Sequence, residues 1–263
     1  MSPDLTVDID DGVAVLTLSR PQHRNAYTAD MGRLLSAAYR DCDARDDIRA
    51  IVLTGAGDCF CVGADLSVGS EPFDATGADF TASPIDPPAF ELSTPVIAAV
   101  NGHAIGIGLT IALQADFRIL AADSKYAVPQ VRRGVVPDCM SHWTLIHLAG
   151  VAAATEVLLT GRTFTAREAL ELKIATRIAD NGAVLDEAMT LARDFAENVA
   201  PTSAALTKRL LWDTTIRGYT PRQVAERETE MHHQVMGSPD AAEGVAAFRE
   251  RRRPRWTGAP ARD

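Results

Sequence analysis

The chain has 263 residues, of which 46% are hydrophobic and 23% are charged, so it can bury a core of ordinary size. Its 26 Lys and Arg against 35 Asp and Glu give a formal net charge of −9 at pH 7. This acidic balance argues against binding to nucleic acid or to an anionic membrane surface.

Cysteine usage and the amino-terminal sequence both indicate a reducing compartment. The four cysteines form no CxxC pair, and the first residues, "MSPDLTVDIDDG", contain no apolar signal region. We therefore expect a cytoplasmic protein. Apolar runs such as "TPVIAAVNG" are too short to span a bilayer, which predicts that the chain has no integral membrane role. The histidines and cysteines lack metal-ligand spacing, so we expect no metal site.

The first half of the chain predicts parallel β-strands connected by helices. Residues 13–20 and 49–55 have the pattern of buried strands, and an amphipathic helix is predicted between them at 28–45. A third strand, at 95–100, leads into a helix that begins near Gly106 or Ile107, and a further strand follows at 117–123. The fold class is therefore α/β.

Two further regions complete the predicted organisation. Residues 69–90 are rich in Gly, Pro, Ser and Asp without any period, which is typical of a surface loop that could line a ligand entrance. From about residue 139 the chain is expected to be almost wholly helical, with its last two helices opened by Thr-Pro and Ser-Pro. We divide the chain into a core at 1–200 and a C-terminal helical region at 201–263.

Glycine-rich turns follow two of the predicted strands. Gly106 and Gly108 give only G-x-G, without the third glycine of a dinucleotide fingerprint or the Lys-Ser/Thr of a P-loop. The turns expose backbone N–H groups near Ala64 and at the first turn of the helix at Ile107. Two preorganised donors aimed at one point can hold an oxyanion. The alternative is that these small residues only allow tight turns and close packing.

The order and spacing of several segments resemble the enoyl-CoA hydratase/isomerase (crotonase) superfamily over nearly the whole chain. The segments are "LSRPQHRNAYT", "GAGDCFCVGADL", "AAVNGHAIGIGL", "ADFRILAADSKYAVPQ", "GVVPDC", "LLTGRTFTAREALELKIATRI" and "EGVAAFRERRRP". This resemblance implies a crotonase (ClpP-like) spiral of ββα turns with a C-terminal α-helical trimerisation region. It also implies an acyl-CoA substrate, no additional cofactor, and a homotrimer or a hexamer made of two trimers.

The same resemblance assigns roles to individual residues. The N–H groups of Ala64 and Ile107 would form the oxyanion hole for the thioester carbonyl, and Arg24 would contact the CoA phosphates. From its residue type alone, Arg24 could equally be a solvated surface charge. The remaining substrate-binding positions that the resemblance implies are Ala26, Asp65, Leu66, Gly106, Thr110 and Gln130.

The chain departs from the family pattern where hydratases carry two glutamates that hold and activate water. Thr110 and Gln130 occupy these positions, and neither side chain ionises near neutral pH. Asp138, in "GVVPDC", is the remaining carboxylate, and isomerase-type members carry an Asp or Glu there to move an allylic proton. The alternative role for Asp138 is a helix N-cap, because Asp after Pro and before a helix is a favoured start signal.

Three functions remain open at this stage. We favour an enoyl-CoA isomerase that shifts a double bond through one Asp base and a two-N–H oxyanion hole. The alternatives are a hydratase with a non-standard base and a catalytically silent acyl-CoA-binding protein. The sequence does not indicate which acyl group the protein binds.

Overall fold

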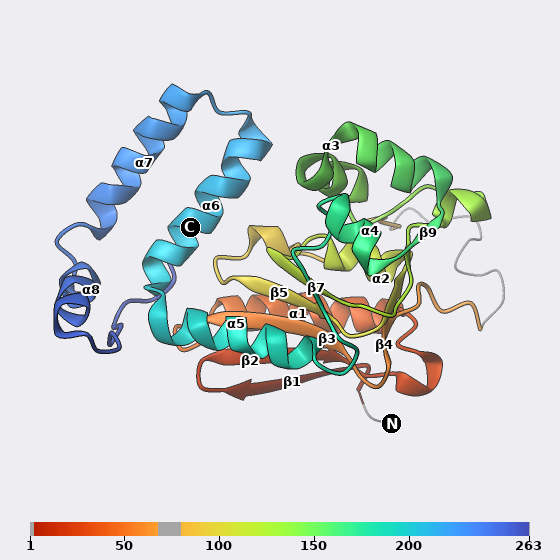
Figure 1. Cartoon of the computed structure of the whole chain (residues 1–263), viewed down its shortest axis with the longest axis horizontal. Helices are drawn as coiled ribbons and strands as arrows, with labels where there is room; N and C mark the ends of the chain where they lie inside the picture. Colours follow the sequence, from red (N-terminus) through yellow and green to blue (C-terminus); the bar gives the residue numbers. More distant parts are fainter. Residues whose placement is uncertain (1–2, 68–79, 263) are drawn as a thin grey trace.

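A six-stranded sheet runs through the computed structural model, which describes residues 3–67 and 80–262 (Figure 1). Its strand order is β1-β2-β3-β5-β7-β10, and all neighbours pair in parallel except β1 and β2. The strands are β1 (Leu5–Asp10), β2 (Val13–Leu18), β3 (Ala50–Gly55), β5 (Val96–Val100), β7 (Phe117–Ala121) and β10 (Arg177–Ala179). The expected strands at 13–20, 49–55, 95–100 and 117–123 are therefore confirmed.

A second, four-stranded sheet has the order β4-β6-β8-β9. Its members are β4 (Cys59–Cys61), β6 (His103–Ile105), β8 (Tyr126–Ala127) and β9 (Thr163–Phe164). Each of the first three follows a strand of the large sheet within a few residues, so that β3 leads to β4, β5 to β6, and β7 to β8. The chain thus advances as a spiral in which each turn contributes one strand to each sheet.

Eight helices complete the described part of the chain. They are α1 (Ala29–Asp43), α2 (Ile107–Ala112), α3 (Ser141–Thr160), α4 (Ala166–Glu171), α5 (Val184–Asn198), α6 (Pro201–Arg217), α7 (Pro221–Val235) and α8 (Pro239–Glu250). The predicted helix at 28–45 corresponds to α1, whose N-cap Thr28 accepts a hydrogen bond from Met31 N. Thr220 and Ser238 cap α7 and α8 in the same way, as the Thr-Pro and Ser-Pro pairs predict.

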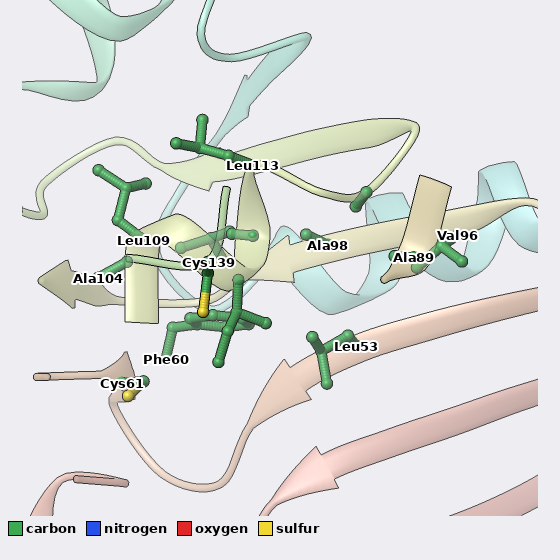
Figure 2. Packing of buried hydrophobic residues seen from close by; sticks show 14 of the residues in the cluster. Leu53, Phe60, Cys61, Ala89, Val96, Ala98, Ala104, Leu109, Leu113 and Cys139 are labelled. Carbon is green, nitrogen blue, oxygen red and sulfur yellow. The ribbon is translucent and has the colours of Figure 1, made fainter. Parts of the chain in front are cut away.

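The two faces of the large sheet are covered by different elements because alternate residues of a strand point to opposite sides. One face packs on α5, where Ala188 and Ala192 meet strand residues that include Val52 and Ile97. The opposite face, with Leu16 and Leu53 among others, belongs to the larger core. Figure 2 shows Leu53 in this core together with Phe60, Ala104, Leu109 and Cys139, which come from the elements that surround the candidate site.

The segment after residue 139 is not as uniformly helical as expected. Strands β9 and β10 interrupt it, and β10 pairs in parallel with β7 at the edge of the large sheet. These strands have only two and three residues, which is too short for a hydrophobic period to develop. Part of the predicted loop at 69–90 lies outside the described residues; its last part forms the short 3₁₀ turn η3 (Ala89–Glu91).

Helix α3 is the one described helix that is long and apolar enough, by length and composition alone, to span a membrane. The expectation that every apolar run is too short was therefore wrong for residues 141–160. The backbone of Gly150 (φ 80°, ψ 164°) is not helical, however, and it divides α3 into two shorter pieces. Each piece buries some of its side chains, including Leu145 in the first and Val157 in the second.

Candidate active site

The turn after β4 holds Ala64 in an extended conformation beside Tyr27. Tyr27 N donates to Gly63 O at 2.8 Å, and Asp65 N donates to Tyr27 O at 2.9 Å, so the two segments form a parallel bridge. Successive peptide groups of an extended chain point to opposite sides. Because the groups on either side of Ala64 face Tyr27, the N–H of Ala64 points away from it.

The turn before α2 places a second free donor close to the first. Gly106 has φ 58° and ψ −127°, a conformation that favours glycine, and its N–H donates to Ala127 O at 2.9 Å. Ile107 is the first residue of α2, so its N–H has no partner within the helix. A Cβ atom at Gly106 would lie 3.8 Å from Gly63 Cα, which shows that the two glycine turns lie against each other.

Gly108 serves close packing rather than a turn. A Cβ atom there would lie 2.7 Å from Cys61 Cβ and would also clash with Cys61 O, so only glycine lets α2 rest directly on β4. The two glycines of the G-x-G segment therefore have separate tasks: Gly106 supplies the backbone conformation, and Gly108 supplies the space.

Asp138, Thr110 and Gln130 come together in one cluster. Thr110 Oγ1 donates to Asp138 Oδ1 at 2.5 Å, and Gln130 Nε2 donates to Asp138 Oδ2 at 3.2 Å. Thr110 lies on α2, Gln130 opens the 3₁₀ turn η4 (Gln130–Arg133), and Asp138 lies between η4 and α3. Thr110 and Gln130 are buried, whereas Asp138 is partly exposed.

The surroundings of Asp138 favour its protonated form. Burial raises the pKa of the Asp138 carboxyl above its usual value, and the hydrogen bonds from Thr110 and Gln130 oppose this effect in part. Tyr27, Cys61 and Cys139 also interact with Asp138 electrostatically, and burial raises the pKa of each of them, that of Cys61 to about 12. These three groups are therefore uncharged where a carboxylate titrates.

The carboxylate of Asp138 is not the N-cap of the following helix. The N-cap of α3 is Met140, which has a left-handed backbone conformation, and no side chain caps the helix. Asp138 contributes only its backbone oxygen, which accepts from Ser141 N at 2.9 Å. Its carboxylate is directed to Thr110 and Gln130 instead.

The expected substrate-binding residues at 24–26 and 64–66 lie around the Ala64 turn. Arg24 is exposed, and its Nε donates to Cys59 Sγ at 3.4 Å. Ala26 is buried, and Leu66 is exposed. The Asp65 carboxylate is fully engaged, since it accepts from Ser67 N at 2.9 Å and from an Arg20 guanidinium N–H at 2.8 Å. These hydrogen bonds, first those of Ser67 and then that of Arg20, hold the pKa of Asp65 well below its usual range.

Two residues that frame this turn received no role from the sequence. Arg20 donates to Ala26 O at 2.7 Å as well as to Asp65. The buried Asn25 side chain donates to Ala56 O at 2.9 Å and to Cys59 O at 2.8 Å, and its Oδ1 accepts from Arg20 N. Both residues belong to the quoted segment "LSRPQHRNAYT", but only the structure shows that they tie this segment to β4 and the Ala64 turn.

In the described ranges 3–67 and 80–262, no group of three His, Cys, Asp or Glu side chains could hold a metal ion. The four cysteines are all buried and unpaired with one another.

Comparison with known proteins decides the family. The family model for enoyl-CoA hydratase/isomerase matches residues 8–259. The chain belongs to the enoyl-CoA hydratase/isomerase family. The crystal structure of a probable enoyl-CoA hydratase/isomerase from Mycobacterium abscessus superposes with a TM-score of 0.94 at 56% identity, covering 97% of this chain and 98% of that one. The fold is thus the expected crotonase fold.

Relatives in this family carry different names. A protein of Alternaria alternata that is 35% identical over 253 residues, covering 94% of this chain and 83% of the relative, is the enoyl-CoA hydratase ACTT3. A protein of Escherichia coli K12 that is 33% identical over 258 residues, covering 95% and 97%, is a 1,2-epoxyphenylacetyl-CoA isomerase. Family membership therefore establishes an acyl-CoA-processing enzyme and leaves the choice between isomerase and hydratase to the residues of the site.

Proposed function

We propose that this enzyme is an enoyl-CoA isomerase that moves a double bond by means of one carboxylate base, Asp138. The observation that supports it most directly is the cluster of Asp138, Thr110 and Gln130. The two hydratase glutamate positions carry side chains that cannot ionise, and both donate to the single carboxylate. A raised pKa makes that carboxylate a stronger base than an ordinary aspartate.

The proposed binding mode uses the Ala64 turn and the start of α2. The thioester oxygen accepts hydrogen bonds from the N–H groups of Ala64 and Ile107, which lie on neighbouring turns. Donors fixed before the reaction stabilise an enolate oxygen better than water does, and the loss of one typically costs about 3 kcal/mol. Arg24, exposed beside Cys59, would supply positive charge for the CoA phosphates.

The proposed reaction is a 1,3-shift of a proton. Asp138 removes a proton from carbon 2 of a 3-enoyl thioester, and the electrons of that C–H bond form an enolate whose oxygen rests on the two N–H groups. The enolate then collapses to a carbon 2–carbon 3 double bond, and the electrons of the former double bond take the proton back from Asp138 at carbon 4. One carboxylate is sufficient because the proton that leaves is the proton that returns.

The decisive experiment follows purified protein with 3-enoyl-CoA and with 2-enoyl-CoA thioesters of several chain lengths. The expected result is conjugation of 3-enoyl-CoA, seen as a rise in ultraviolet absorbance, at a rate that falls about 10²- to 10⁴-fold in Asp138→Asn. Calorimetry should show that this variant still binds acyl-CoA. Asp123→Asn, which alters an exposed carboxylate, is the control and should react as the wild type does.

The other outcomes identify the alternative functions. Rapid loss of the 2-enoyl chromophore without any conjugation of 3-enoyl-CoA would establish a hydratase with a non-standard base. Binding of acyl-CoA without turnover of either substrate would establish a silent acyl-CoA-binding protein. Either result would reject the isomerase proposal.

A further inference from the structure

We infer that Thr110 and Gln130 are positioning residues that hold the base, one neutral donor on each oxygen of Asp138. This inference rests on the proposed role of Asp138, and it gives the two residues a task other than contact with substrate or water. They would act on the reaction only through Asp138.

Thr110 and Gln130 lie between the Asp138 carboxylate and the proposed oxyanion site. Thr110 lies one helical turn after Ile107, and its hydroxyl is 2.5 Å from Asp138 Oδ1 and 3.2 Å from Ile107 O. The Gln130 amide reaches Asp138 Oδ2 at 3.2 Å, and its Nε2 lies 3.7 Å from the point where a Cβ of Gly106 would stand. Thr110 therefore contacts both the carboxylate and the Ile107 carbonyl, and Gln130 binds the carboxylate from a position near Gly106.

Burial leaves these side chains little freedom to choose other partners. Thr110 has no exposed surface, and Gln130 is 8% exposed. A threonine hydroxyl has one proton to donate, and the short distance to Oδ1 assigns that proton to the carboxylate. The amide presents its nitrogen to Asp138, because its oxygen there would face another acceptor.

The chemical character of the donors matters as much as their position. Among the described residues, no cationic side chain contributes to the pKa of Asp138, and Tyr27, Cys61 and Cys139 remain neutral beside it. An adjacent cation would typically lower a carboxyl pKa by about 1–3 units and so weaken the base. Two neutral donors fix the orientation of the carboxylate while burial keeps its pKa raised.

The test measures the titration of Asp138 directly, in the free protein. The carboxyl carbons of aspartate are labelled with ¹³C, and Asp138→Asn assigns the Asp138 signal. Thr110→Val should move the titration upward by about one to two pH units, because a hydrogen bond to the charged form is lost. Thr110→Ser restores the hydroxyl and should return the titration to the wild-type value. Gln130→Met, which removes the other donor, should shift it in the same direction.

Thr54→Val is the matched control, because Thr54 of β3 is also a buried threonine. Its hydroxyl donates to Ala99 O of β5 at 3.0 Å. It should leave the Asp138 titration unchanged. In turnover assays, the acid limb of the kcat/KM profile should move with the titration in Thr110→Val, while KM stays close to the wild-type value.

The possible failures can be told apart. An unshifted Asp138 titration in both Thr110→Val and Gln130→Met would overturn the positioning role, whether or not the enzyme is an isomerase. Full isomerase turnover by Asp138→Asn would instead reject the proposed function. It would also show that the cluster of Asp138, Thr110 and Gln130 has no role in catalysis. Shifted titrations together with a displaced kcat/KM profile would support both.

Discussion

Asp65 and Asp138 show how one type of side chain acquires two roles from its surroundings. Asp65 accepts hydrogen bonds from Ser67 and the Arg20 guanidinium, so its charged form is stabilised and its pKa lies well below the usual range. Asp138 is partly buried and has neutral groups as its neighbours, so burial destabilises its charged form and raises its pKa. The first carboxylate stabilises the Ala64 turn, whereas the second is suited to accept a proton.

These opposite shifts predict opposite effects on stability. The favourable contribution of Asp65 is present above its unfolded pKa of about 3.9 and is lost as the pH falls toward the folded value. The contribution of Asp138 is present below about pH 3.9 and is lost as the pH rises through its raised folded pKa. At pH 7 we therefore expect Asp65→Asn to lower the melting temperature and Asp138→Asn to raise it, each by a few degrees.

Thermal unfolding followed by circular dichroism at pH 7 and at about pH 4 checks this prediction. The Asp138→Asn difference should shrink at the lower pH as the wild-type Asp138 takes up a proton. The Asp65→Asn difference should largely persist, because the folded pKa of Asp65 lies well below pH 4. Asp47→Asn, at an exposed pair with Arg45, is the control and should change little at either pH. A destabilised Asp138→Asn at pH 7 would mean that this carboxylate is a structural group after all.

At the level of elements, the contact between α2 and β4 depends on one missing methyl group. Gly108→Ala would place a Cβ against Cys61 O and Cys61 Cβ, both in a buried strand. We expect this overpacking to reduce the free energy of unfolding by about 1–3 kcal/mol and to disturb the start of α2. Thermal unfolding and acyl-CoA calorimetry should both respond.

Gly244 of α8 offers a matched control for this substitution. A Cβ there would meet Trp256 at 3.4 Å, an ordinary contact, and its backbone is helical. Gly244→Ala should therefore be neutral or stabilising, by up to about 1 kcal/mol. Equal melting temperatures for the two alanine variants would show that the α2–β4 contact can relax without cost.

The long elements could be predicted from the sequence, because each carries enough apolar residues for its period to show. Strand β3 and helix α1 are of this kind, and the start of α2 was predicted within one residue. Strands β4, β6 and β8 were not predicted as separate elements, since they have only two or three residues each and are defined by pairing with one another. Pairing partners distant in sequence leave no local pattern.

Part of the candidate site could likewise be predicted from the sequence, and part could not. The family resemblance assigned the proposed roles of Ala64, Ile107 and Asp138, and the structure places Gly63 and Gly106 against each other. The hydrogen bonds from Thr110 and Gln130 to Asp138 could not be predicted, because they join residues 28 and 8 positions apart through the turn geometry. The contact of Arg20 with Asp65 depends likewise on how two segments 45 positions apart meet.

For the molecule as a whole, α6 is tied to the core while the next helix, α7, is not. The buried Lys208 ammonium donates to Ala89 O and Thr94 O, both at 2.9 Å, and pairs with Asp116 at 2.7 Å. Trp212 donates to the other Asp116 oxygen at 2.9 Å. Helix α7, by contrast, buries none of its described residues, and Figure 1 shows it standing away from the two sheets beside α6.

Large apolar side chains are exposed on this C-terminal region and on α3. Phe248 of α8 is 85% exposed, Leu211 of α6 is 66% exposed, and Leu159 of α3 is 72% exposed. Large apolar side chains that one chain leaves exposed can be buried by association with further chains. We propose that further copies of the chain cover it, in the trimer or hexamer of two trimers that the family resemblance implies.

Light scattering at micromolar concentration checks this assembly and should give a mass of three or six chains. Phe248→Asp and Leu211→Asp should shift the population toward smaller species, because each places a charge at a contact that association would desolvate. Val7→Asp, on the exposed edge strand β1, is the control and should leave the mass unchanged. A wild-type monomer would reject the assembly, and full-size oligomers from both C-terminal variants would place the contact elsewhere on the chain.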